Sequence, residues 1–348
     1  MGITNQLNKP GGLLAVCLCF AASTVNAGEA IPARFDLQAH RGGLGLMTEN
    51  SLQAFANALE LGVTTLELDI QITADGMAVV THDRQVQPHK CRDTRPAFID
   101  DPQFPYVGDH IRNLTLAQVK TLNCGYQQLP GYPEQRVVEH VTMPLLAEVF
   151  QLFKRYGDNS VMLNIETKVE AAAPEETAPR SQFIDAVLAE IDIWHMRGQV
   201  TIQSFDWGTL HAWQVAAPDI PLIALTNGQS FLRCDEPGRS PWLGDLDMDD
   251  FDCDVVAAVA SFNANALSPV HGDPQDGRYS EPDYVPFVNK AMVESAHARG
   301  IEVIPWTVDD KATMHYLMDL GVDGIITNYP DRLRQVMAER GLPLPAPL

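Results

Sequence analysis

Short apolar segments alternate with longer amphipathic segments along most of the chain. The short segments are typical of buried strands, and in the longer ones apolar residues recur at helical spacing. This pattern predicts strands at 35–39, 65–72, 161–165, 200–203, 222–225, 264–267, 302–307 and 324–327. It predicts helices at 51–61, 147–156, 183–194, 208–217, 288–299, 311–320 and 331–339.

Strands that alternate with helices predict a parallel sheet, because a parallel strand can follow another only after a crossover. Eight such units in a chain of 348 residues favour a closed (β/α)8 barrel over an open doubly wound sheet. No glycine-rich phosphate loop follows a strand, which removes the commonest reason for the open form. We therefore expect an α/β fold with a single TIM-barrel domain at residues 28–348.

The segment after the strand at 65–72 departs from this alternation. Asp75-Gly76 lies between two apolar runs, as in a tight β-hairpin, so we expect residues 77–82 to return antiparallel to the strand. A two-residue turn would place His82 opposite Asp69. Two long insertions, at 84–144 and 226–262, lack a regular pattern, and segments of this kind usually form lids or ligand walls.

The first 27 residues have the order of features found in signal peptides. Lys9 precedes a short apolar run at 13–22, and Val25-Asn26-Ala27 offers small residues at a cleavage site. The run is too short to span a bilayer. We expect export to the periplasm or the medium, with the mature chain starting at Gly28.

Four cysteines remain in the predicted mature chain. An even number in an exported protein suggests disulfides, and four cysteines allow three pairings. The pairing with short loops is Cys91 with Cys124 and Cys234 with Cys253, and the alternative is four free thiols. No spacing of the C-x-x-C type favours a metal site at these residues.

The formal net charge is −21, while 45% of the residues are hydrophobic and 20% are charged. A large core is therefore expected, and so acidic a surface argues against nucleic-acid binding and against stable membrane insertion. A phosphate-bearing substrate would need a local exception, such as a basic side chain or a bound cation. The composition does not indicate an oligomeric state.

Three carboxylates are predicted to meet at the carboxyl ends of the strands, where TIM barrels hold their active sites. Glu67 and Asp69 are two residues apart, so both point to one face of their strand, and Glu166 ends the next strand of the barrel. Three converging oxygen ligands indicate one divalent cation, Ca²⁺ or Mg²⁺. The alternative is that the acids are buried ion-pair partners of Arg41 and Lys168.

Two histidines lie at the same predicted face. His40 ends the first strand and His82 ends the return arm, where a neighbouring carboxylate would raise its pKa into the acid–base range. Together with Arg41 and Lys168, which could hold phosphate oxygens, they suggest phosphoryl transfer with acid–base catalysis. The aromatic side chains that follow two further strands are candidates for substrate contact: Phe205 and Trp306.

The sequence resembles the glycerophosphodiester phosphodiesterase family over nearly all of the mature chain. The resemblance rests on the motifs Ala39-His40-Arg41-Gly42, Glu49-Asn50-Ser51, Glu67-Leu68-Asp69, Asp75-Gly76, His82-Asp83, Leu114-Thr115-Leu116, Met143-Pro144-Leu145, Asn164-Ile165-Glu166-Thr167-Lys168, Trp306-Thr307-Val308 and 321–330. It implies a TIM barrel with an insertion near 84–144, an acid–base pair of His40 and His82, metal ligands at Glu67, Asp69 and Glu166, and phosphate contacts from Arg41 and Lys168. Thr48 and Ser51 depart from the usual Pro and Thr, outside the catalytic set.

The resemblance also implies an activity. The enzyme would cleave a small-molecule glycerophosphodiester to an alcohol and sn-glycerol 3-phosphate. The glycerol 2-hydroxyl would attack phosphorus to give a cyclic phosphate that water then opens. The two histidines would exchange roles between the steps, so neither is assigned as acid or base. The sequence leaves open the head alcohol and two alternatives: a catalytically inactive barrel that binds phosphodiesters, and a phospholipase D-like enzyme acting on intact lipids.

Overall fold

The structure, a computed structural model of the chain, describes residues 1–2, 34–157 and 160–348. Most of the predicted signal peptide lies outside the described residues, so it stays a prediction. Residues 34–348 form one compact unit. Among the described residues, no helix is both long and apolar enough to cross a bilayer.

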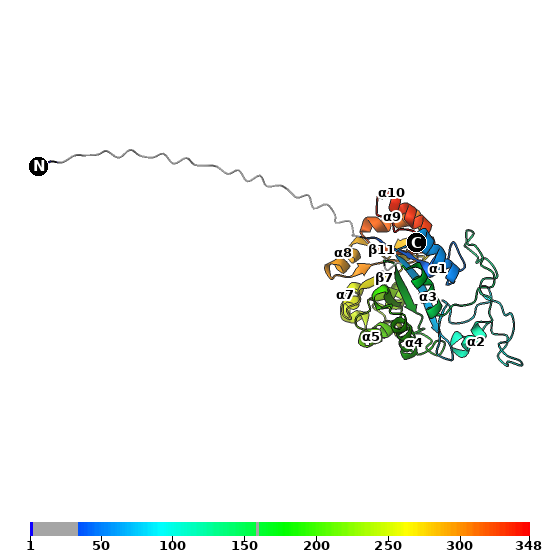
Figure 1. The fold of residues 1–348 in the computed structure, drawn as a ribbon. Coiled ribbons are helices and arrows are strands. Elements are labelled where there is room, and N and C mark those ends of the chain that lie inside the picture. Colours follow the sequence, from blue (N-terminus) through cyan, green and yellow to red (C-terminus); the bar gives the residue numbers. More distant parts are fainter. Residues whose placement is uncertain (3–33, 158–159) are drawn as a thin grey trace. The chain divides into compact units, whose positions relative to one another are not determined.

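Eight parallel strands of the described chain form the predicted barrel (Figure 1). In spatial order they are β10 (Glu302–Val303), β7 (Ala266–Pro269), β6 (Leu222–Thr226), β5 (Val200–Ser204), β4 (Met162–Thr167), β2 (Thr65–Ile72), β1 (Asp36–Ala39) and β11 (Gly324–Thr327). Backbone hydrogen bonds from Asp323 N to Val303 O (3.0 Å) and from Ile326 N to Pro305 O (3.0 Å) join the two end strands. The predicted α/β TIM-barrel fold is therefore confirmed.

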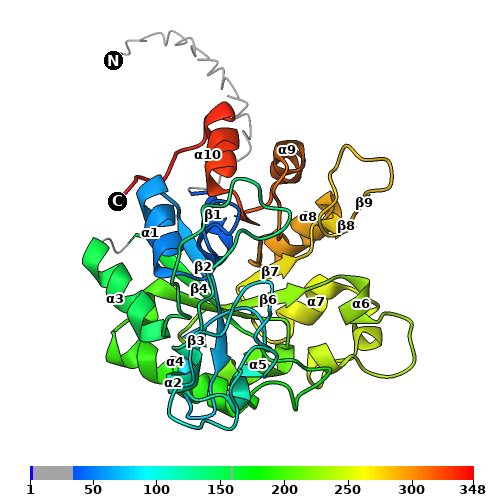
Figure 2. The same ribbon diagram turned by 90° about the vertical axis from the view of Figure 1, so that its right-hand side faces the viewer.

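Helices surround the strands in both ribbon views (Figures 1 and 2). They are α1 (Leu52–Leu61), α3 (Leu146–Tyr156), α4 (Arg180–Ile193), α5 (Trp207–Ala216), α7 (Val255–Ala260), α8 (Lys290–Ala298), α9 (Lys311–Leu320) and α10 (Pro330–Glu339), with short helices α2 (Leu116–Val119) and α6 (Gln229–Leu232). The predicted helices are confirmed within a few residues at each end. The sequence pattern missed α7, a short helix inside an insertion, which Asp254 caps by accepting hydrogen bonds from Val256 N and Ala257 N.

Alternation along β2 shows how the strands divide core from site. Leu66, Leu68 and Ile70 are at most 1% exposed and belong to the main hydrophobic core. Burial of each such side chain contributes about 1.5–3 kcal/mol. Glu67 and Asp69 point the other way, into the barrel, where Glu67 accepts a hydrogen bond from Gln203 and Asp69 accepts one from Asn50. The outer layer therefore stabilises the fold and leaves the inner face for chemistry.

The strand predicted at 302–307 is shorter in the structure, where β10 covers only Glu302–Val303. Pro305 has no N–H group and interrupts the regular ladder. Trp306 N still donates to Pro269 O (3.1 Å), so the chain continues beside β7 and carries Trp306 to the carboxyl end of the barrel.

The return arm is present as β3 (Ala78–Val80), antiparallel to β2. Its predicted register is wrong by one residue, because Ile70 faces Val80 and Asp69 faces Thr81 through a hydrogen bond from Thr81 N to Asp69 O (3.0 Å). The turn has three residues instead of two: Thr73 N donates to Met77 O (3.0 Å), and Gly76 takes a φ of 80° that favours glycine. His82 therefore lies beyond the end of the strand pairing.

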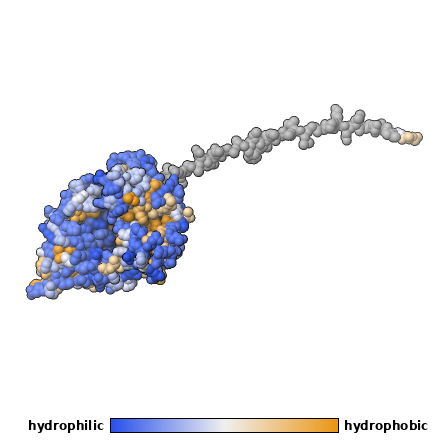
Figure 3. Space-filling view, turned by 180° about the vertical axis from the view of Figure 1, so that it is seen from behind, coloured by the Kyte–Doolittle hydropathy of each residue, from blue (hydrophilic) through white to orange (hydrophobic). Residues whose placement is uncertain are grey.

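The 84–144 insertion builds a small hydrophobic cluster of its own around the buried side chains of Val86, Tyr106, Ile111, Leu114 and Leu122. In Figure 1 it lies to the right of the barrel, and in Figure 2 it faces the viewer across the strands. Figure 3 shows the molecule from behind. The surface on this side is mainly hydrophilic, and hydrophobic residues gather in a limited area.

One of the two predicted disulfides is confirmed. Cys91 and Cys124 are bonded and close a segment of the 84–144 insertion. The prediction for Cys234 and Cys253 is wrong for this structure, in which both are free thiols. Burial, the neighbouring thiol and nearby acidic groups raise the pKa of Cys234 to about 12, which disfavours the thiolate that forms disulfides.

Candidate active site

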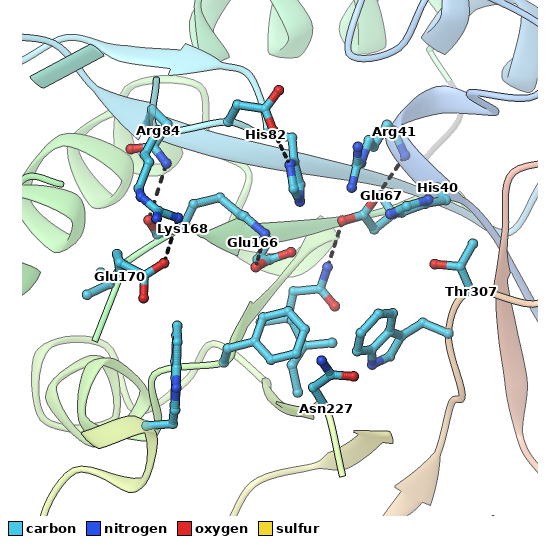
Figure 4. Close-up of a pocket in the computed structure, with 18 of the residues that line it drawn as sticks. His40, Arg41, Glu67, His82, Arg84, Glu166, Lys168, Glu170, Asn227 and Thr307 are labelled. Carbon is cyan, nitrogen blue, oxygen red and sulfur yellow. Dashed lines mark hydrogen bonds and ion pairs between the residues drawn. The ribbon is translucent and has the colours of Figure 1, made fainter. Parts of the chain in front are cut away.

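The predicted site residues meet around a cavity of about 640 Å³ at the carboxyl ends of the strands. Its lining includes eight of the nine candidates, namely His40, Arg41, Glu67, His82, Glu166, Lys168, Phe205 and Trp306. Asp69, the ninth, is fully buried beside them. Figure 4 shows the labelled histidines, Glu67, Glu166 and Lys168 pointing into one space from several strands.

The three carboxylates converge as predicted. One oxygen atom from each of Glu67, Asp69 and Glu166 lies within 4.8 Å of the others. The three residues are 1%, 0% and 6% exposed, respectively. Glu67 accepts hydrogen bonds from Arg41 N and Gln203 Nε2, both at 2.8 Å, whereas Asp69 Oδ1 is buried without a hydrogen-bond partner.

The electrostatics of the cluster favour a cation. Burial, with the charges of Asp69 and Glu166, raises the pKa of Glu67 well above its usual value. Burial raises the pKa of Glu166 to about 7, although Lys168 opposes the change. Burial acts in the same direction on Asp69, but the positive groups around it, including Arg41, bring its pKa below the usual value. An oxygen-only donor set with one unpartnered oxygen fits a hard divalent cation.

The ion pairs proposed as the alternative are also present. Lys168 Nζ lies 2.8 Å from Glu166 Oε1 and 3.8 Å from Asp69 Oδ1. Arg41 Nε lies 3.4 Å from Asp69 Oδ2, and Arg41 Nη1 lies 3.0 Å from Glu49 Oε2. Arg41 and Lys168 therefore border the carboxylate cluster. Phosphate oxygens bound next to the cluster could contact both of these side chains.

His40 follows β1, and its ring is held by a contact of 2.6 Å from Nδ1 to Asn328 Oδ1. Burial, and then the charge of Arg41, lower the pKa of His40 to about 3. The imidazole is thus neutral at physiological pH and able to accept a proton.

His82 is held differently, by a contact of 2.9 Å from Nδ1 to Asp83 Oδ1. Asp83 in turn lies 2.7 Å from Lys90 Nζ, which also contacts Glu49. The expected rise in the pKa of His82 is wrong: burial, Arg41 and Lys168 lower it well below 6.5 and outweigh the effect of Asp69.

Aromatic side chains line the opposite wall of the cavity. Phe205 and Trp306 pack edge to face with ring centres 5.2 Å apart. The sequence reasoning missed Phe231 and Trp242, which stack at 4.3 Å and line the same cavity. Both come from the 226–262 insertion. The only feature of the sequence that could have indicated them is that they are aromatic residues in a long acidic loop. We call these four residues the aromatic wall.

The geometry can be compared with known proteins. A profile of the glycerophosphoryl diester phosphodiesterase family matches residues 40–332, a span that contains the whole cluster. The chain belongs to this family. It is therefore an enzyme, a glycerophosphodiester phosphodiesterase, and it hydrolyses phosphoric diesters.

Relatives within and beyond the bacteria support this membership. A glycerophosphodiester phosphodiesterase of Bacillus subtilis is 27% identical over 330 residues, covering 93% of this chain and 94% of the relative. The Homo sapiens lysophospholipase D GDPD3 is 22% identical, with 88% and 86% covered.

Solved structures share the fold. A glycerophosphoryl diester phosphodiesterase structure from Silicibacter pomeroyi has a TM-score of 0.71 and 28% identity, with 90% of this chain and 96% of that chain covered. An Oleispira antarctica phosphodiesterase in complex with the product sn-glycerol-3-phosphate has a TM-score of 0.60 and 18% identity, with 87% and 96% covered.

Proposed function

We propose that this enzyme hydrolyses small glycerophosphodiesters to an alcohol and sn-glycerol 3-phosphate, with His40 and His82 as the acid–base pair. The observation that carries the proposal is the convergence of both imidazoles, three buried carboxylates, Arg41 and Lys168 on one cavity. A complete set of this kind also argues against a barrel that only binds phosphodiesters.

Glu67, Asp69 and Glu166 would hold one divalent cation, Ca²⁺ or Mg²⁺. When bound, such a cation neutralises phosphate charge and relieves the repulsion among the three carboxylates. Arg41 and Lys168 would bind the non-bridging phosphate oxygens, since their charged groups border the cluster. Their ion pairs with the carboxylates would weaken as the substrate enters.

The reaction would proceed in two steps. One histidine takes the proton of the glycerol 2-hydroxyl, the new bond from that oxygen to phosphorus forms, and the bond from phosphorus to the head alcohol breaks. The negative charge of the bound phosphate would favour protonation of the second histidine, which gives its proton to the departing alcohol oxygen and leaves a cyclic glycerol phosphate. Water then opens the ring with the proton transfers reversed, and sn-glycerol 3-phosphate is released. The tethered hydroxyl has a large proximity advantage over free water in the first step.

The aromatic wall would contact the organic part of the substrate. Phe205 and Trp306 are only partly buried and face the cavity next to Lys168, whose Nζ lies 5.5 Å from the centre of the Phe205 ring. An apolar wall beside the phosphate site would bury the carbon atoms of the diester and orient it. Phe231 and Trp242 would extend this contact toward the second alcohol.

A periplasmic or extracellular location is part of the same proposal. The predicted signal peptide at 1–27 and the Cys91–Cys124 disulfide support it, because disulfides persist in oxidising compartments. The substrate would then be a diester met outside the cytoplasm. The acidic composition is the basis for expecting no nucleic-acid partner and no stable membrane insertion.

A second candidate, hydrolysis of lysophospholipids, is favoured by the human lysophospholipase D relative and by the aromatic wall. The test compares glycerophosphocholine with lysophosphatidylcholine as substrates of the purified protein, with metal-free, Ca²⁺-loaded and Mg²⁺-loaded samples. We expect glycerophosphocholine to release choline only in the loaded samples. Faster release from lysophosphatidylcholine would favour the second candidate, and undiminished release after exhaustive chelation would contradict the metal role.

A further inference from the structure

Two residues outside the predicted set are linked to His40 by short hydrogen bonds. Asn328 follows β11, and its Oδ1 lies 2.6 Å from His40 Nδ1. Its Nδ2 donates to Asp309 Oδ2 at 2.7 Å. We propose that Asp309 and Asn328 are positioning residues that hold His40 in the tautomer with the hydrogen on Nδ1, so that Nε2 is the atom that exchanges protons with the substrate. This inference rests on the proposed role of His40 in catalysis.

The direction of the hydrogen bonds from His40 through Asn328 follows from the chemistry of the Asp309 carboxylate, where they end. An ionised carboxylate only accepts hydrogen bonds, so the NH₂ group of Asn328 must face Asp309. The amide oxygen then faces His40 and can only accept, so His40 Nδ1 must donate. A neutral imidazole that donates through Nδ1 carries its lone pair on Nε2.

Asp309 is held as an acceptor by several donors. Besides the amide of Asn328, its carboxylate accepts from Asn328 N (2.9 Å) and from Thr327 Oγ1 (3.1 Å). The net effect of burial is to raise the pKa of Asp309 above its usual value, although these hydrogen bonds and the charge of Arg332 oppose the change. Three donors to one carboxylate favour its ionised form and fix the direction of the chain of hydrogen bonds.

Asn328 itself has little freedom. It is 4% exposed, its backbone N–H is bound to Asp309, and its backbone oxygen accepts from Gly45 N (3.0 Å). The backbone of Asn328 is thus fixed by Asp309 on one side and by Gly45, in the loop after His40, on the other, and the side-chain amide is fixed by its own bond to Asp309. An amide held this tightly can orient a ring, because it cannot turn away without losing its own contacts.

The comparison with His82 shows that the arrangement is particular to His40. His82 Nδ1 is held by the carboxylate of Asp83, its own neighbour in sequence. Among the described residues, the His40 ring has its one hydrogen bond with Asn328 through Nδ1, and His40 lines the cavity, so that Nε2 remains for a substrate. Both imidazoles therefore use Nδ1 for positioning, one on an amide and one on an acid.

The first test is kinetic and uses the metal-loaded full-length protein with glycerophosphocholine. Loss of a partner that orients a histidine typically lowers activity about 10–100-fold. We expect Asn328→Ala to lower kcat by this factor with KM nearly unchanged. In a His40→Ala background the same change should have no further effect, because it acts through His40. Asn265→Ala, which removes an asparagine contact to Leu222 N at the opposite end of the barrel, is the control.

The second test exchanges the two partners. In the double variant Asp309→Asn with Asn328→Asp, the new amide can donate to the new carboxylate, which can still accept from His40 Nδ1. We expect this variant to recover most of the activity lost in Asn328→Ala. Circular dichroism and thermal unfolding show whether each variant is folded. An unfolded Asn328→Ala protein leaves the exchange variant and the spectroscopic test below to decide.

The third test needs no variant of the two partners. The ¹⁵N NMR spectrum of histidine-labelled protein reports which ring nitrogen carries the hydrogen, and His40→Ala identifies the signal. We expect His40 to be protonated on Nδ1 at neutral pH. Protonation on Nε2, or an equal loss of kcat from Asn328→Ala with and without His40, would overturn the inference. Full activity of His40→Ala alone would instead overturn the proposed function.

Discussion

Removing one charge from the carboxylate cluster should change how stability depends on pH. Burial, with the charge of Asp69 and against that of Lys168, raises the pKa of Glu166 from 4.5 to about 7. A carboxyl group whose pKa rises on folding binds its proton more tightly in the folded state. Its contribution to stability is therefore present below pH 4.5 and is lost as the pH rises through about 7.

The magnitude follows from the change in pKa. A rise from 4.5 to about 7 corresponds to about 3 kcal/mol of stability lost across that pH range in the metal-free protein. At about 2.1 cal/mol/K of unfolding entropy per residue, a domain of roughly 300 residues would lose about 5 °C in Tm. A cation at 100 times its Kd would return about 2.7 kcal/mol. Its effect should grow with pH, because protons compete for the same oxygens.

The assay is differential scanning calorimetry of wild type and Glu166→Gln between pH 5 and pH 8, with EDTA or with excess Ca²⁺ or Mg²⁺. We expect Glu166→Gln to gain stability relative to metal-free wild type as the pH rises, and to lose most of the metal-induced increase in Tm. Glu139→Gln, at an exposed position, is the matched control. A stability difference between wild type and Glu166→Gln that does not vary with pH would contradict the raised pKa of Glu166. An unchanged metal effect in Glu166→Gln would contradict its role as a metal ligand.

Three further predictions concern catalysis, stability and substrate contact. His40→Ala and His82→Ala should each lower kcat by about 10²–10⁴-fold with little change in KM. A substrate lacking the glycerol 2-hydroxyl should react far more slowly than the natural diester. Equal rates for the two substrates would point to water as the first nucleophile. Reduction of the disulfide between Cys91 and Cys124, which are 33 residues apart, should lower the free energy of unfolding by about 3–4 kcal/mol in denaturant titrations, and an unchanged midpoint would count against this. Trp242→Ala should raise KM by about 10-fold through lost apolar burial while kcat stays near wild type, and a fall in kcat alone would argue against a contact role.

Periodicity and motif spacing were enough to predict the barrel and many of the residues that line its cavity. Leu66 and Glu67 illustrate why: the period of two along a strand decides which side chains face the helices and which face the interior. Parallel strands then bring their carboxyl ends together, so Glu166 could be placed beside Glu67 without coordinates.

Details that depend on local backbone geometry were not accessible in this way. The register of His82 failed because Asp75-Gly76 is compatible with turns of two or three residues, and only the structure shows the longer one. Asn328 and Asp309, which position His40, come from the C-terminal part of the chain. No sequence period links them to His40. The pKa of His82 was misjudged because burial and two cations outweigh one carboxylate.

We propose that this cavity hydrolyses glycerophosphodiesters by internal attack. The most direct measurement follows the turnover of glycerophosphocholine by metal-loaded enzyme with ³¹P NMR. We expect a transient cyclic glycerol phosphate that gives way to glycerol phosphate, with choline as the other product. Formation of phosphocholine and glycerol, or no turnover with either Ca²⁺ or Mg²⁺, would contradict it.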